Sequence, residues 1–140
     1  AQALIHYLAC QKVELFDGTI VPLFGGIFGI YGHGNVAGLG EALWEYRSQI
    51  PFFRGQNEQG MAHAAIGYAK ANHCRRIMAV TSSIGPGATN MVTAAALAHT
   101  NRLPVLFLPG DIYANRRPDP VLQQLEDERC AYASVNDCFI

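Results

Sequence analysis

Short apolar segments without regular polar–apolar alternation constrain the fold most strongly. They cover residues 27–31, 76–81 and 104–108, and a polar or glycine-containing turn follows each of them. Strands that are buried on both faces have this continuous apolar character, and they occur mainly in parallel sheets covered by helices. We therefore predict an α/β fold, a three-layer α/β/α sandwich with a mainly parallel sheet.

Helical patterns separate the apolar segments, as this fold requires. They cover residues 1–10, 36–46, 58–72 and 87–99, with a further short strand at 51–54 and, after a Pro-rich loop at 116–120, a short helix at 121–128. In the second helix we expect Val36, Leu39, Leu43 and Trp44 to share one buried face. Asn57 directly precedes the third helix, where its side chain can cap the first turn.

Composition excludes several classes of protein and indicates a larger assembly. Charged residues make up only 15% of the 140 residues, so we expect much of the surface to be buried against another domain or subunit. The net charge is −1 and no Lys/Arg-rich run occurs, which argues against a nucleic-acid partner. Glycine, proline and polar residues interrupt the two long uncharged stretches, so we expect no membrane span. The four cysteines form no paired motif, which favours free thiols and a cytoplasmic protein.

Ligands of parallel sheets bind where the strands end, so the segments that leave the strands are the candidate site. Gly32, Gly34 and Ala37 match the dinucleotide fingerprint loosely, but the next strand ends in arginine rather than an acidic residue, so a tight turn is the alternative. The loop Gly85-Pro86-Gly87 lacks the lysine of a nucleotide-binding P-loop. Its glycines instead allow the backbone to approach a flat or bulky ligand closely.

Glu58 is the candidate acid–base residue, because it is the one carboxylate of its helix and small apolar residues follow it. One interpretation is a surface glutamate that stabilises the helix dipole. The other is a partly desolvated carboxylate suited to proton transfer. His63 lies five residues further on, which is not the spacing of a zinc-binding helix, so no metal site is expected. For His33 and His63 the default is a core histidine bonded to a backbone carbonyl.

Four sequence blocks together resemble the pyrimidine-binding domain of thiamine-diphosphate enzymes related to acetolactate synthase. The blocks are GIYGHGNV at 29–36, NEQGMAHAA at 57–65, GPGATNMVTAA at 85–95 and PDPVLQQ at 118–124. The second and third are typical of the whole family. G-H-G-N and P-D-P-V-L-Q-Q resemble more specifically the members that act on a cyclic 1,2-dione in myo-inositol catabolism.

The resemblance implies that residues 1–140 are the N-terminal pyrimidine-binding domain of a larger multidomain homo-oligomer. The cofactor would be thiamine diphosphate, with Mg²⁺ bound by a domain absent from this chain and no metal ligand within it. The catalytic residue would be Glu58, whose hydrogen bond to a ring nitrogen of the aminopyrimidine promotes the imino tautomer. That tautomer would remove the thiazolium proton, and the resulting carbanion would attack a substrate carbonyl.

The family motifs also imply the other site residues and the reaction. Cofactor contacts are expected at Gly32, Glu58, Gly85, Pro86, Gly87 and Asn90, and substrate contacts or proton transfer at His33, Asn35, Gln59 and His63. The expected reaction is hydrolytic C–C cleavage that opens a small-molecule cyclic dione, with the isolated fragment inactive. The alternatives are an acetolactate synthase-like enzyme, a decarboxylase of a 2-oxo acid or malonic semialdehyde, and a non-catalytic α/β interaction module.

Overall fold

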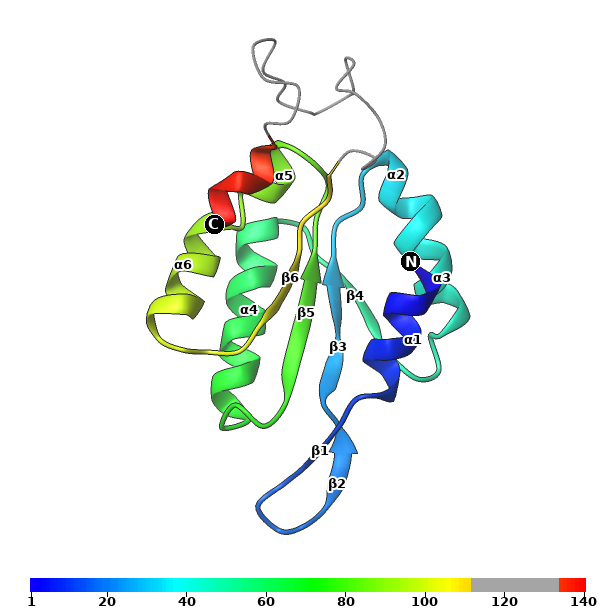
Figure 1. Cartoon of the computed structure of the whole chain (residues 1–140), viewed down its shortest axis with the longest axis vertical. Coiled ribbons are helices and arrows are strands. Elements are labelled where there is room, and N and C mark those ends of the chain that lie inside the picture. The colour runs from blue at the N-terminus through cyan, green and yellow to red at the C-terminus, as the bar shows by residue number, and fades with distance from the viewer. Residues whose placement is uncertain (112–133) are drawn as a thin grey trace.

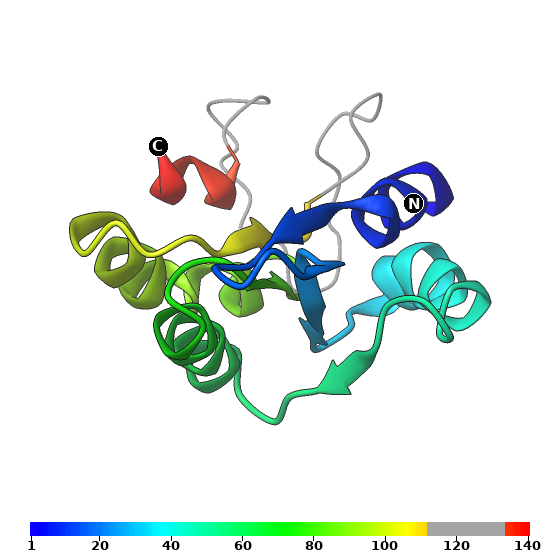
Figure 2. The same ribbon diagram turned by 90° about the horizontal axis from the view of Figure 1, so that it is seen from below.

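A four-stranded parallel sheet lies between two layers of helices in the computed structural model, which describes residues 1–111 and 134–140 (Figures 1 and 2). The strands lie in the order β4–β3–β5–β6; they are β3 at Phe24–Gly29, β4 at Phe52–Arg54, β5 at Ile77–Thr81 and β6 at Leu106–Leu108. The predicted three-layer α/β/α sandwich is confirmed. The loop and helix predicted at 116–128 lie outside the described residues.

The carboxyl ends of the four strands form one edge of the sheet. Gly29 of β3 pairs with Arg54 on one side and Thr81 on the other, and Thr81 in turn pairs with Leu108. From β3 the chain continues to β4 on one side, whereas from β5 it continues to β6 on the other. The order of strands therefore reverses between β3 and β5, which is where open parallel sheets bind their ligands.

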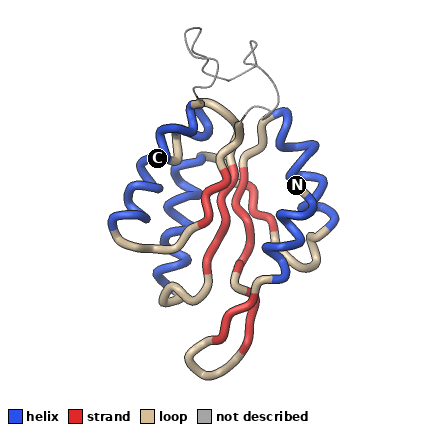
Figure 3. Tube along the Cα trace, viewed as in Figure 1, coloured by secondary structure: helices blue, strands red, loops and turns tan. Residues whose placement is uncertain are grey.

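Two hydrophobic cores, one on each face, hold the helices to the sheet. Helices α4 (Glu58–Ala71) and α6 (Val92–Thr100) cover one face, and α1 (Gln2–Cys10) and α3 (Glu41–Glu45) cover the other (Figure 3). Strand β5 serves both cores because its side chains alternate. The first core contains Met61, Ala62, Ala65, Ile66, Met78, Val80, Met91, Ala94 and Ala98, and the second contains Ile5, Leu8, Phe24, Ile27, Ala42, Leu43, Ile50 and Ala79.

The second helix differs from its prediction. It begins earlier, with α2 at His33–Asn35, and continues through a π-helical segment at Val36–Gly40 into α3. The wider π-turn rotates the residues on either side of it relative to a regular α-helix. The expectation of one shared buried face was therefore wrong: Leu43 is buried, but Val36 is 53% and Trp44 70% exposed.

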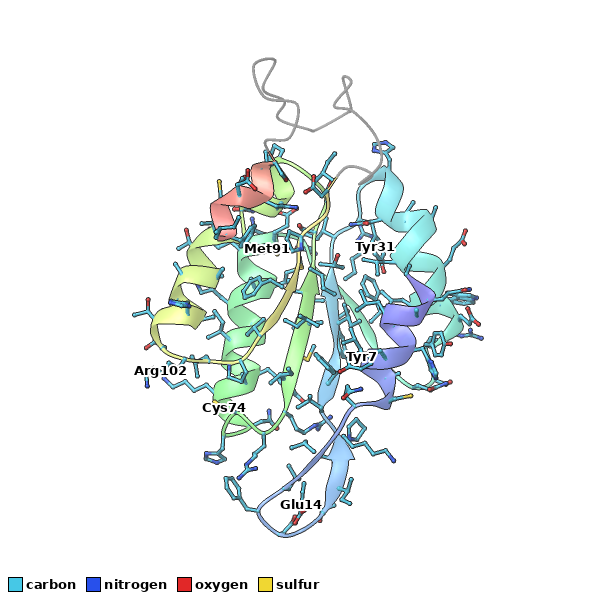
Figure 4. The ribbon with its side chains drawn as sticks, viewed as in Figure 1. Tyr7, Glu14, Tyr31, Cys74, Met91 and Arg102 are labelled. Carbon is cyan, nitrogen blue, oxygen red and sulfur yellow. The ribbon has the colours of Figure 1, made fainter. Side chains whose placement is uncertain are left out.

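Two further features depart from the predictions. An antiparallel hairpin of β1 (Lys12–Glu14) and β2 (Ile20–Pro22) projects from the end opposite the carboxyl edge, where Figure 4 labels Glu14. No strand was predicted there. The helix predicted over 87–99 is divided into α5 (Pro86–Thr89) and α6, because the chain makes a turn at Asn90 and Met91, where the Met91 amide donates to the Ala88 carbonyl three residues back.

Within residues 1–111 and 134–140, no helix is long and apolar enough to cross a membrane. Three of the four cysteines can be described. Cys10, Cys74 and Cys138 are exposed free thiols, as the spacing predicted. Cys130 lies outside the described residues.

Candidate active site

An open pocket of about 640 Å³ lies at the carboxyl edge of the sheet, next to the switch point. Its lining comes from the segments that follow β3, β4 and β5: Ile30, Tyr31, Glu58, Ser83, Pro86, Gly87, Thr89 and Asn90. Figure 4 labels Tyr31 in this half of the molecule. One carboxylate, one amide and several hydroxyl groups line a pocket of the size that small ligands occupy. The amide and the hydroxyl groups can form hydrogen bonds with a neutral ligand, and the carboxylate can exchange a proton with it.

Glu58 reaches the pocket because it is the first residue of α4. Asn57 caps this helix in an extended conformation, φ −151°, and its Oδ1 accepts a hydrogen bond from the Gly60 amide at 2.8 Å. The predicted cap is confirmed. The Gly55 amide donates to the Gly29 carbonyl at 3.1 Å, which ties the preceding turn to β3. The glutamate is therefore fixed at a defined place beside the strand ends, where it is partly buried.

The carboxylate of Glu58 is held by a residue 32 positions along the chain. The Asn90 Nδ2 donates to Glu58 Oε2 at 3.0 Å. The other carboxylate oxygen lies on the side of Gly87, where an added Cβ would come within 3.2 Å of Oε1. The absence of a side chain at Gly87 thus keeps the space at Oε1 open.

A tight turn brings the backbone of the GPG loop against Glu58. Gly85 has φ +61° and ψ −121°, a conformation that residues with a side chain rarely adopt. Pro86 follows as the first residue of α5, the helical position that suits proline best. The sequence Gly85-Pro86-Gly87 therefore reverses the chain and begins a helix within three residues.

Gly32 lies against Ser83, which lines the pocket, and we predict that Gly32→Ala displaces Ser83 and destabilises this side of the pocket. Its Cβ would lie 2.4 Å from Ser83 Oγ, and Ser83 is only 7% exposed, so Ser83 must move. Such overpacking costs about 1–3 kcal/mol. At Gly34, a helical position, a Cβ would have no atom within 4 Å, so Gly34→Ala should stabilise by about 0.5–1 kcal/mol. Thermal unfolding of the full-length protein compares the two variants; equal midpoints would contradict this account.

The four residues predicted for substrate contact or proton transfer do not line the pocket. His33 is exposed on α2, so the expectation that it is a core histidine was wrong, because this helix begins outside the core. His63 Nδ1 donates to the Gln59 carbonyl at 2.8 Å, as expected for a partly buried histidine. Asn35 Nδ2 donates to the Ser82 carbonyl at 2.9 Å and so ties α2 to the end of β5.

Ile30, Tyr31, Ser83 and Thr89 line the pocket but were not predicted as site residues. Tyr31 and Ser83 lie two residues beyond the ends of β3 and β5, so the strand-end rule alone could have found them. The Tyr31 ring stacks on Phe52 with centroids 5.1 Å apart. Burial raises the pKa of Tyr31 to about 12, so its hydroxyl stays neutral at physiological pH.

Residues 25–130 match the family model described as "Thiamine pyrophosphate enzyme, N-terminal TPP binding domain". The match covers most of the chain, which therefore belongs to this family of thiamine-diphosphate (thiamine pyrophosphate) enzymes. The pocket at the switch point lies inside the matched region, as do all ten predicted site residues.

Bacterial proteins named 3D-(3,5/4)-trihydroxycyclohexane-1,2-dione hydrolase are similar over almost the whole chain. One such protein from Bacillus cereus is 54% identical over 139 residues, which is 99% of this chain and 21% of that protein. The protein from Geobacillus thermodenitrificans is 55% identical over 139 residues, 99% of this chain and 22% of that protein. The chain thus spans about one fifth of the length of these relatives.

Proposed function

We propose that this chain is the N-terminal pyrimidine-binding domain of a multidomain, thiamine-diphosphate-dependent hydrolase. The enzyme would open a cyclic 1,2-dione by C–C cleavage in myo-inositol catabolism. The family and the names of the relatives support this proposal. The observation that carries it is the Glu58 carboxylate, which lies in a pocket at the strand ends with one oxygen held by Asn90.

The lining of the pocket suits the pyrimidine end of thiamine diphosphate. A flat aminopyrimidine needs a narrow space and a carboxyl group for its ring nitrogen; Gly87 and Glu58 Oε1 supply these. Ile30 and Pro86 add apolar contact area. Among the described lining residues the one charged side chain is Glu58, which suits a pyrimidine and repels a diphosphate. Gly32 would act by leaving space for Ser83, and Gly85 by forming the tight turn that precedes Pro86.

Each residue of the pocket then has a separate task. Bound thiamine diphosphate supplies a nucleophilic carbon for a carbonyl of the substrate. Glu58 Oε1 holds or accepts the proton at the pyrimidine ring nitrogen, the acid–base step for which the protein is responsible. Asn90 keeps Oε2 occupied, and Tyr31 offers a neutral hydroxyl from the segment that follows β3. We place His33 near the substrate, because it is exposed at the same edge of the sheet. Asn35, Gln59 and His63 would support the site from their present hydrogen bonds.

The remaining parts of the site would come from outside this chain. We propose that Mg²⁺ and the diphosphate are held by a later domain, contributed by a second subunit of a cytoplasmic homo-oligomer. The low charged fraction of the chain supports extensive contacts of this kind. The length of the relatives leaves room for such domains, because four fifths of their chains lie outside the matched part.

Product analysis tests the proposed reaction. The full-length enzyme, with thiamine diphosphate and Mg²⁺, should convert the inositol-derived cyclic dione to an open-chain acid and leave pyruvate largely unchanged. Acetolactate or CO₂ from pyruvate would instead indicate a synthase or a decarboxylase. No conversion of either substrate, with or without thiamine diphosphate, would indicate a non-catalytic module.

A further inference from the structure

We propose that Asn90 is a positioning residue that fixes the Glu58 carboxylate, so that Oε1 and not Oε2 meets the ligand. This inference rests on the proposed function and adds a specific role for a second residue. It makes Asn90 act through Glu58, in addition to any contact of its own with the pyrimidine.

The contact geometry distinguishes the two oxygens of the carboxylate. Asn90 Nδ2 donates to Oε2 at 3.0 Å, whereas Oε1 lies next to the empty side of Gly87. A hydrogen bond from an amide to one oxygen of a carboxylate fixes the orientation of the carboxylate. Without this bond, both oxygens could rotate into the pocket, and the carboxyl group would lose its defined direction.

Asn90 is itself rigidly mounted. The backbone amide of Asn90 donates to the Pro86 carbonyl at 3.0 Å. The next residue, Met91, is fully buried in the core between α4 and the sheet. Met91 and Met61 belong to the same hydrophobic cluster, so α4 and the α5–α6 junction are packed against each other. The interruption between α5 and α6 therefore places the Asn90 amide at a fixed position relative to the start of α4.

Measurements on the full-length enzyme can isolate this role. Asn90→Ala should lower kcat roughly 10- to 100-fold, the effect of a misplaced reacting group, with a smaller change in KM.

Asn101→Ala is the matched control. Asn101 directly follows the last residue of α6 and is exposed. Its Nδ2 donates to the Leu97 carbonyl at 2.9 Å, so its substitution removes a comparable side-chain hydrogen bond remote from Glu58. This variant should keep the wild-type kcat and KM.

An exchange of the two functional groups provides a readout that does not depend on catalysis. In the apo protein at pH 8, Asn90→Asp should lower the unfolding midpoint, because two carboxylates then face each other. Adding Glu58→Gln should restore much of the midpoint, since an amide again meets a carboxylate. Turnover should nevertheless stay as low as in Glu58→Gln alone.

The outcomes separate the inference from the proposed function. Wild-type kcat and KM in Asn90→Ala, together with a strong defect in Glu58→Gln, would overturn the positioning role and leave the proposed function intact. The positioning role is overturned as well if the effects of Asn90→Asp and Glu58→Gln on the unfolding midpoint are additive. If activity needs no thiamine diphosphate, the proposed function fails and the inference falls with it.

Discussion

Glu58→Gln in the full-length enzyme should lower kcat by roughly 10²- to 10⁴-fold, the usual effect of removing one positioned acid–base group. Glutamine keeps nearly the same size and can still form hydrogen bonds, so KM for the substrate should change little. It cannot exchange a proton with the pyrimidine ring. Deuterium exchange at the cofactor's reactive carbon, measured without substrate, should slow in parallel with turnover.

Glu41→Gln is the matched control for this experiment. Glu41 is also an acidic residue in the first turn of a helix, α3, but it is exposed and does not line the pocket. Its substitution should leave exchange and turnover at wild-type rates. If both variants behave like the wild type, Glu58 only stabilises the helix dipole, and its catalytic role would have to be abandoned.

The 140-residue chain by itself should show no turnover and should bind thiamine diphosphate at least about 10²-fold more weakly than the full-length enzyme. Two or three charge-assisted hydrogen bonds to the diphosphate, at about 1.5–3 kcal/mol each, would be missing, and two of the weakest already account for this factor. The only charged group among the described lining residues is the Glu58 carboxylate, which does not attract an anion.

Calorimetry with both proteins measures this difference. A cooperative thermal transition must first establish that the isolated chain is folded. Micromolar affinity of a folded fragment would show that the chain holds the diphosphate without the rest of the enzyme.

The strands and most helices could be predicted because their signals are local. β3, β5 and β6 are continuous apolar segments, and α4 begins at its capping residue Asn57, as expected. The position of Glu58 at the sheet edge followed from the same reasoning, since the segment leaves a parallel strand. These features depend on residues that are neighbours in the sequence.

Other features depend on contacts that single-segment patterns do not contain. The bond between Asn90 and Glu58 joins the α5–α6 junction to the start of α4. The hairpin has strands of only three residues each, too short for a period to be recognised. In the second helix the π-turn altered the phase of the pattern, so Trp44 was assigned to the wrong face.

The π-helical segment affects the local stability of the side of the pocket that contains Tyr31. Gly34, Gly38 and Gly40 lie in or next to it, and each glycine lowers the local stability of a helix by about 0.8–1 kcal/mol relative to alanine. Tyr31, which forms part of the pocket wall, packs close to Gly40. We therefore expect this side of the pocket to open locally at a smaller free-energy cost than the side with Glu58, which is backed by the closely packed α4. Hydrogen exchange should accordingly be faster in the π-helical segment than in α4.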